Sequence, residues 1–180
     1  DQLAPGDGQS APTPVLVAVR LDPAGVPCPL EPGAPTLFAY LPTAERTGLR
    51  VLVHARFVLP MDRERVDLAL PGNRAALEHA GELLARIAAR LVERARADGA
   101  AEPPLDGLLD VLPLTDELRH PARAGLLERL RRGAAQLPLL PGADGTRLPP
   151  AAALLCEHGP LCAALAGVAV DPRGRRLLAP

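Results

Sequence analysis

The chain has 180 residues and a formal net charge of -1. Its overall electrostatic field therefore does not favour nucleic acid or an anionic membrane as a partner. Hydrophobic residues make up 48% of the chain but aromatic residues only 2%, so the core must be built from leucine, valine and alanine. No apolar run approaches the roughly 18 residues that a membrane-spanning helix needs, and we expect no membrane partner.

Residue types that are absent exclude several kinds of chemistry. The chain has no lysine, which rules out a Walker-type phosphate loop, a Schiff base and a lysine general base. Its only serine, Ser10, lies in a proline- and glycine-rich stretch, residues 1–14, which we expect to be a flexible tail. A serine hydrolase is therefore not expected.

The cysteines favour reduced thiols in a cytoplasm. Cys28, Cys156 and Cys162 are an odd number in a chain too long to need disulfide staples. Cys156, His158 and Cys162 lie close in sequence, but a zinc site needs about four ligands at tighter paired spacing. We therefore expect structural thiols and no metal.

Three strands are predicted in the first third of the chain, at residues 15–20, 36–42 and 49–59. The last shows the clearest alternation of apolar and polar residues, so one of its faces should be buried. The segment "PTAERTG" between the second and third strands has the length of a hairpin loop and favours an antiparallel pair. Residues 21–35 are rich in proline and glycine and predict an ordered connection.

A long helix is predicted over residues 71–98. Asn73 is a candidate cap. Glu82, Arg86 and Arg90 stand four apart and predict stabilising pairs on a solvated face, with a nucleic-acid-binding stripe as the weaker alternative. The apolar stripe expected to face the sheet comprises Leu77, Ala80, Leu84, Ile87, Leu91 and Ala95.

Residues 99–104 read as a linker between a lobe at residues 15–98 and a mainly helical lobe at residues 105–180. The predicted elements of the second lobe are helices at 105–111, 123–136, 151–157 and 160–166, a hairpin over 137–150 that turns at Asp144 and Gly145, and a last strand and helix within 168–178. The predicted class is α+β, with a small, mostly antiparallel sheet packed by a long helix.

One stretch resembles a known family. The segment "LFAYLPTAERTGLRVLVHARFVLPMDRERVDLALPGN", from Leu37 to Asn73, resembles the part that follows the ATP-binding domain in sacsin-like bacterial proteins of the GHKL ATPase superfamily. The string "LPMDRE" is similar to the "LNISRE" loop in the middle domain of the ninety-kilodalton heat-shock chaperones. The resemblance extends over residues 37–91 and, with less force, to the hairpin "LPLLPGADG".

The resemblance implies a role for one arginine. Arg63 occupies the place of the arginine that reaches the terminal phosphate of the nucleotide, and Glu64 follows it as in the chaperone loop. A guanidinium suits that role because it stays charged and its planar fork can bond two phosphate oxygens. Arg65 is a second candidate.

The resemblance also implies what lies elsewhere. The superfamily binds nucleotide through an asparagine-bearing helix and glycine-rich motifs, whereas Asn73 is the only asparagine here and lies within the middle-domain segment. The chain begins with Asp1 rather than Met, and we expect a piece of a longer cytoplasmic protein. An N-terminal ATP-binding domain of the same chain would then bind ATP and Mg, with no cofactor and no activity in this piece alone.

Two other interpretations stay open. Asp62, Arg63, Glu64 and Arg65 are also what a solvated turn with local ion pairs would contain. The chain could instead be a non-catalytic module that holds a client or partner protein through apolar surface at residues 105–114 or 137–140. A free-standing enzyme has no supporting constellation, and the histidines, His54, His79, His120 and His158, are expected to be structural.

Overall fold

A computed structural model describes residues 14–61, 64–97, 106–112, 120–142, 146–154 and 176–177. The predicted tail, the linker at 99–104 and the helix at 160–166 lie outside these residues, apart from Pro14 at the end of the tail. The two-lobe division stays a prediction. Among the described residues, however, both predicted lobes contribute side chains to one continuous core.

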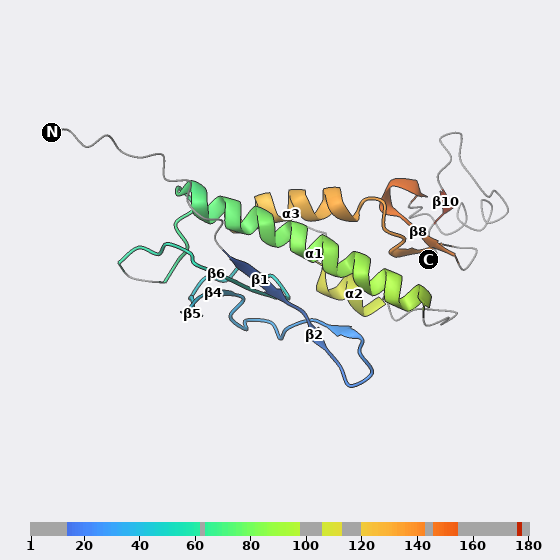
Figure 1. The fold of residues 1–180 in the computed structure, drawn as a ribbon, viewed down its shortest axis with the longest axis horizontal. Helices are drawn as coiled ribbons and strands as arrows, with labels where there is room; N and C mark the ends of the chain where they lie inside the picture. The colour runs from blue at the N-terminus through green and yellow to red at the C-terminus, as the bar shows by residue number, and fades with distance from the viewer. Residues whose placement is uncertain are drawn as a thin grey trace.

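A four-stranded mixed sheet forms one layer of the molecule (Figure 1). Its strands are β1 (Val15–Ala18), β4 (Leu37–Ala39), β5 (Leu41–Pro42) and β6 (Leu52–Ala55), in the order β1-β6-β4-β5. β1 is antiparallel to β6, with Val15 opposite Ala55. The predicted alternation is confirmed, because Val51, Val53 and Ala55 are buried while Leu52 and His54 are only partly so.

The predicted hairpin between the second and third strands is wrong. β4 runs parallel to β6, with Leu37 opposite Val53. The reason is Tyr40, whose φ of 68° lies in the left-handed region that bulky residues rarely adopt. This residue turns the chain back at once, so β5 pairs antiparallel with β4 and the "PTAERTG" loop becomes a crossover to β6.

Threonines hold that crossover in place. The Thr36 and Thr47 hydroxyl oxygens lie 2.7 Å apart in a buried hydrogen bond. The Thr43 hydroxyl donates to the Leu37 carbonyl oxygen at 3.1 Å, and the Thr47 hydroxyl accepts from the Leu49 N–H at 3.1 Å. Buried hydroxyls that are all partnered in this way fix the path of a loop.

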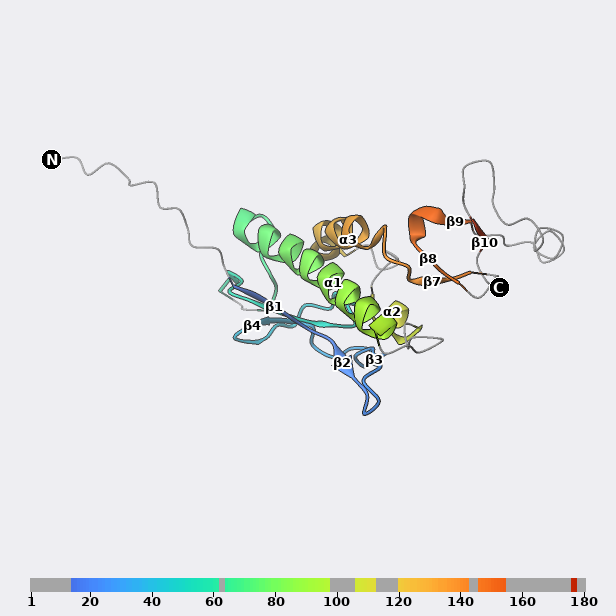
Figure 2. The same cartoon turned by 45° about the vertical axis from the view of Figure 1, so that its right-hand side comes forward.

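The long helix is confirmed as α1 (Pro71–Ala97), and it lies between the sheet and α3 (Pro121–Ala134). Figures 1 and 2 both show the sheet on one side of α1 and α3 on the other. Leu77, Leu84 and Val92 are buried, but Ile87 and Leu91 are only partly buried, against prediction. Ile87 and Leu91 border a hollow beside Val15 and Val17 of β1, which leaves them partly exposed.

Small residues bring α1 and α3 close together. A Cβ atom built on Gly81 would collide with the carbonyl oxygen of Leu126, and one built on Gly133 would meet the side chain of Ala85. One built on Gly125 would come within 3.0 Å of the Glu78 Cγ. The helix backbones therefore approach more closely than ordinary side chains would allow.

The remaining elements are short. β2 (Arg20–Leu21) and β3 (Pro27–Cys28) form a hairpin within the predicted connection, and α2 (Asp106–Val111) packs against β3. The hairpin predicted near Asp144 is confirmed as antiparallel β7 (Leu140–Pro141) and β8 (Arg147–Leu148), although its turn lies outside the described residues.

The C-terminal predictions are confirmed only in part. In place of the first residues of the helix predicted at 151–157, the structure has a 3₁₀ turn (Pro150–Ala152) and β9 (Ala153–Leu154). β10 (Arg176–Leu177) lies within the stretch 168–178, for which a last strand and a helix are predicted, and it pairs parallel with β9. The α+β class is confirmed, and none of the described helices is long and apolar enough to cross a bilayer.

Candidate functional site

The charged loop, residues 60–65, begins where the chain leaves the sheet beyond β6. Asn73, which is only 2% exposed, anchors the backbone on the N-terminal side of this loop. Its side-chain oxygen accepts from the Val58 N–H at 2.9 Å, and its side-chain nitrogen donates to the carbonyl oxygens of Val58 and Asp67, both at 2.8 Å. Asn73 therefore fastens the segment that follows β6 to the start of α1, and the predicted capping role is wrong.

Replacing Asn73 with Ala should destabilise the fold by about 2 kcal/mol, because backbone groups of Val58 and Asp67 lose their partners. Urea unfolding gives this value from the shift of the midpoint at constant slope. The exposed Glu93→Ala change on the same helix should stay within about 0.5 kcal/mol of wild type. Equal free energies of unfolding for the two variants would contradict the anchoring of Val58 and Asp67 by Asn73.

The C-terminal end of the charged loop is bound to the crossover segment between β5 and β6. The Ala44 N–H donates to the Glu64 carbonyl oxygen at 2.9 Å, and the Val66 N–H donates to Glu45 Oε2 at 2.8 Å. Both flanks of the loop are thus tied to other elements, one through Asn73 and the other through residues 44–45.

Glu45 also connects the loop to α3. Its second oxygen, Oε1, lies 3.0 Å from His120 Nε2, and the pair is largely buried. His120 precedes α3, and its Nδ1 accepts the Ala122 N–H at 3.2 Å. Because Nδ1 accepts, the ring donates from Nε2 to the carboxylate. A single carboxylate thus joins Val66 to the first turn of α3.

A double-mutant cycle tests this link. Glu45→Ala and His120→Ala should each destabilise the fold, while the pair together should cost less than their sum, with a coupling of about 1 kcal/mol. Glu45→Gln removes the negative charge of the side chain but keeps an amide oxygen that can accept one hydrogen bond. It therefore separates the contribution of the charge from that of the hydrogen bond. Additive single changes would contradict the link.

The structure places the predicted site residues unequally. Asp62 and Arg63 lie outside the described residues. Arg65 is exposed, and in the described part of the chain it has no hydrogen bond or ion pair. Met61, on the other flank, is fully exposed at 101%. The described flanks of the charged loop therefore face solvent.

A hollow of about 480 Å³, lined mainly by apolar side chains, lies next to the start of the charged loop. It is bordered by β5 and by the chain that leaves β6, through Tyr40, Leu41, Phe57, Leu59 and Pro60 among others. Tyr40 and Leu41 are 71% and 73% exposed. The Arg56 Nε donates to the Tyr40 hydroxyl at 3.0 Å, which fixes the ring over this edge. The hollow therefore adjoins Pro60, the first residue of the charged loop.

Apolar surface is not found where the alternative interpretation expected it. Within the described parts of residues 105–114 and 137–140, Leu108, Val111, Leu112 and Leu139 are buried in the core. The large exposed apolar side chains of the described residues lie on the first lobe instead, and include Tyr40, Leu41, Val58 and Met61. Leu109, Leu137 and Leu140 are only partly buried. The described parts of these two segments show no large exposed apolar side chain, and docking there stays a prediction.

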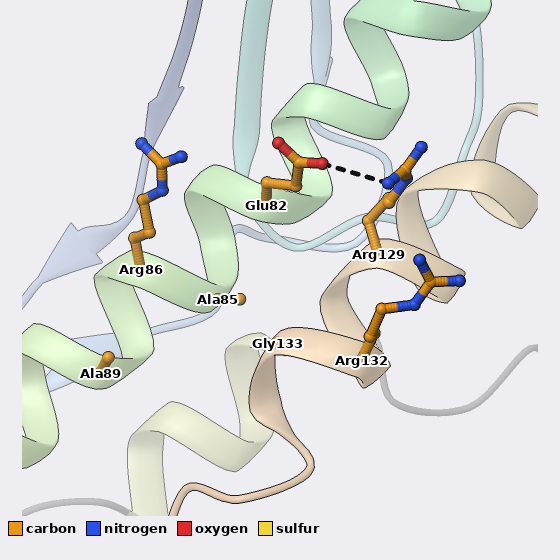
Figure 3. Close-up of a pocket in the computed structure, with 7 residues that line it drawn as sticks. All are labelled: Glu82, Ala85, Arg86, Ala89, Arg129, Arg132 and Gly133. Carbon is orange, nitrogen blue, oxygen red and sulfur yellow. Dashed lines mark ion pairs between the residues drawn. The ribbon is translucent and has the colours of Figure 1, made fainter.

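A second hollow, of about 330 Å³, lies between α1 and α3 (Figure 3). Arg129 bonds Glu78 through Nη2 at 2.7 Å and approaches Glu82 at 3.4 Å. The hydrogen bond to Glu78, and then its charge, raise the pKa of Arg129 above its ordinary value. These pairs join the two helices, so the predicted Glu82–Arg86 pairing is replaced by contacts across the helix interface. No His, Cys, Asp or Glu cluster suited to a metal occurs in the described ranges.

Sequence reasoning missed Glu45 and His120 as partners, and it misassigned Asn73. All three act through contacts between segments far apart in the chain, which periodicity cannot reveal. Comparisons with protein-family models, curated proteins and solved structures found no match. The family therefore stays an expectation that rests on the quoted motifs.

Proposed function

We propose that this chain is the coupling module of a chaperone-like ATPase of the GHKL superfamily in the bacterial cytoplasm. In this role Arg63 contacts the terminal phosphate of ATP held with Mg by an N-terminal ATP-binding domain of the same protein. Arg65 is the second candidate. The module alone binds no cofactor and turns over no ATP.

The observation that carries the proposal is the anchoring of both flanks of the charged loop. Asn73 fastens Val58, and residues 44–45 fasten Glu64 and Val66, while Met61 and Arg65 face solvent. A loop that delivers a cation to a separate domain needs fixed ends and accessible side chains, because positioning contributes much of the catalytic effect in phosphoryl transfer.

The surroundings of the loop support coupling rather than chemistry alone. The apolar hollow beside Tyr40 and Leu41 offers surface on which a neighbouring domain could dock. The Glu45 carboxylate links the end of the loop to His120 and α3. A displacement of the loop on phosphate contact would therefore act on the helical part through this carboxylate.

The test is steady-state ATP turnover by the longer protein with Arg63→Ala. A large fall at retained nucleotide binding supports the proposal, and unchanged turnover removes it. A longer protein that binds no nucleotide would also remove it.

The alternative is a non-catalytic module that holds a client or partner protein, and the exposed Tyr40, Leu41, Val58 and Met61 favour it. In that case Leu41→Ser together with Met61→Ser should abolish partner capture without changing ATP turnover. Loss of turnover in the same double variant would instead favour docking of the ATP-binding domain on this surface.

A further inference from the structure

α1 overhangs the open side of the sheet next to β1. Leu83, Ile87 and Leu91 follow one another at four-residue steps and are only partly buried. They border a hollow of about 430 Å³ whose other wall is Val15 and Val17 of β1. No residue of β4 or β6 lines this hollow, so it lies at the outer side of β1 and not over the middle of the sheet.

The backbone of β1 is open on that same side. β1 is the terminal strand in the order β1-β6-β4-β5, and in the described residues β6 is its only partner. A terminal strand presents alternate N–H and C=O groups that another strand can pair with. The overhanging leucine and isoleucine side chains would cover such an added strand, as α1 covers the rest of the sheet.

Two arginines give the hollow a charge. Arg86 and Arg90 border it, are exposed and stand one helical turn apart. Neither has an ion pair with any residue of the described chain. Figure 3 shows the Arg86 guanidinium directed away from the Glu82–Arg129 pair, although Arg86 also borders the hollow between α1 and α3. The rim of the hollow is therefore cationic, and it favours carboxylates.

We propose that this edge binds an extended acidic peptide segment, which adds as a strand to β1. Alternate side chains of the segment face α1, where apolar side chains enter the hollow and two carboxylates that stand two residues apart meet Arg86 and Arg90. Backbone hydrogen bonds to β1 supply affinity and the two kinds of side chain supply selectivity, as in other strand-addition sites. The inference is independent of the ATPase proposal.

A second copy of the chain fits this edge poorly. Pairing β1 with β1 of another copy about a two-fold axis would place both α1 helices on the same face of the joined sheet. Arg86 and Arg90 of the two copies would then face each other, and like charges at an interface are unfavourable. Charge complementarity thus selects an acidic partner.

The experiment uses fluorescence anisotropy with the labelled peptide Val-Thr-Glu-Thr-Glu-Thr-Val, whose glutamates and valines share one face when extended. The control peptide replaces both glutamates with lysine. Wild type should prefer the acidic peptide, and Arg86→Glu with Arg90→Glu should weaken that binding at least about tenfold. The charge-reversed variant should in turn prefer the lysine peptide, which also shows that it is folded.

Two controls place the binding at this edge. Arg96→Glu, an exposed change on the last turn of α1, should leave binding of the acidic peptide within about twofold of wild type. Hydrogen exchange should slow at the amides of Val15–Ala18 when the acidic peptide is present. Binding that ignores the charge of the peptide or of residues 86 and 90, unchanged exchange in β1, or self-association through β1 would each overturn the proposal.

Discussion

ATP turnover by the longer protein should fall about a thousandfold when Arg63 is replaced with Ala. Removing a guanidinium from a transferring phosphoryl group withdraws charge that matters most in the transition state, so the rate constant should fall while the Kd for ATP changes little. A thousandfold loss corresponds to about 4 kcal/mol. Arg63→Lys should recover little, because an ammonium cannot bond two phosphate oxygens in one plane.

Two further variants make this result specific. Arg50 is an exposed arginine that precedes β6, at the opposite end of the strand from the charged loop, and Arg50→Ala should leave turnover unchanged. Arg65→Ala should have a small effect if Arg63 makes the phosphate contact. A collapse of turnover in Arg65→Ala with normal turnover in Arg63→Ala would transfer the role to Arg65, and normal turnover in both would end the proposal.

Gly81→Ala should destabilise the fold by about 2 kcal/mol or more, despite the better helix propensity of alanine. The added methyl group would collide with the carbonyl oxygen of Leu126 and also lie 3.1 Å from the Arg129 Cβ. Backbone cannot turn aside as the end of a flexible side chain can, so the two helices must separate. Gly81→Val should cost more still, and chemical denaturation would measure both changes.

Gly72→Ala is the matched control on the same helix. A Cβ atom at Gly72 meets nothing within 4 Å, and the position lies in the first turn of α1. The substitution should be neutral or stabilise the fold by up to about 1 kcal/mol. Equal effects at Gly72 and Gly81 would show that helix propensity, and not the close approach of α3, decides the stability of these variants.

Local patterns predicted the elements better than their pairing. α1 could be predicted because its 27 residues repeat the helical period many times, and the burial of Val51, Val53 and Ala55 follows from simple alternation. The parallel β4–β6 pair could not be predicted, because it depends on the positive φ of Tyr40. Glycine, and to a lesser degree asparagine and aspartate, indicate a positive φ in a sequence, whereas tyrosine does not.

The candidate site, like the fold, could be predicted only in part. The charged loop is visible in the sequence as a break in an apolar strand, but its anchors are not. An asparagine near the start of a helix is typical of a cap, whereas Asn73 bonds the backbone of Val58, in the segment that follows β6. Ile87 and Leu91 fit the helical stripe, and only the position of β1 shows that they overhang the sheet edge.

The glycine-mediated contact of α1 with α3 has a mechanical consequence. Helices whose backbones are in contact cannot slide or roll past each other without a collision. α1 and α3 should therefore tilt together as one rigid body. At 1.5 Å per residue, the 27 residues of α1 span about 40 Å. A rotation of about 5° at the loop end would sweep the opposite end through about 3.5 Å, the scale of displacement that separates engaged from released surfaces.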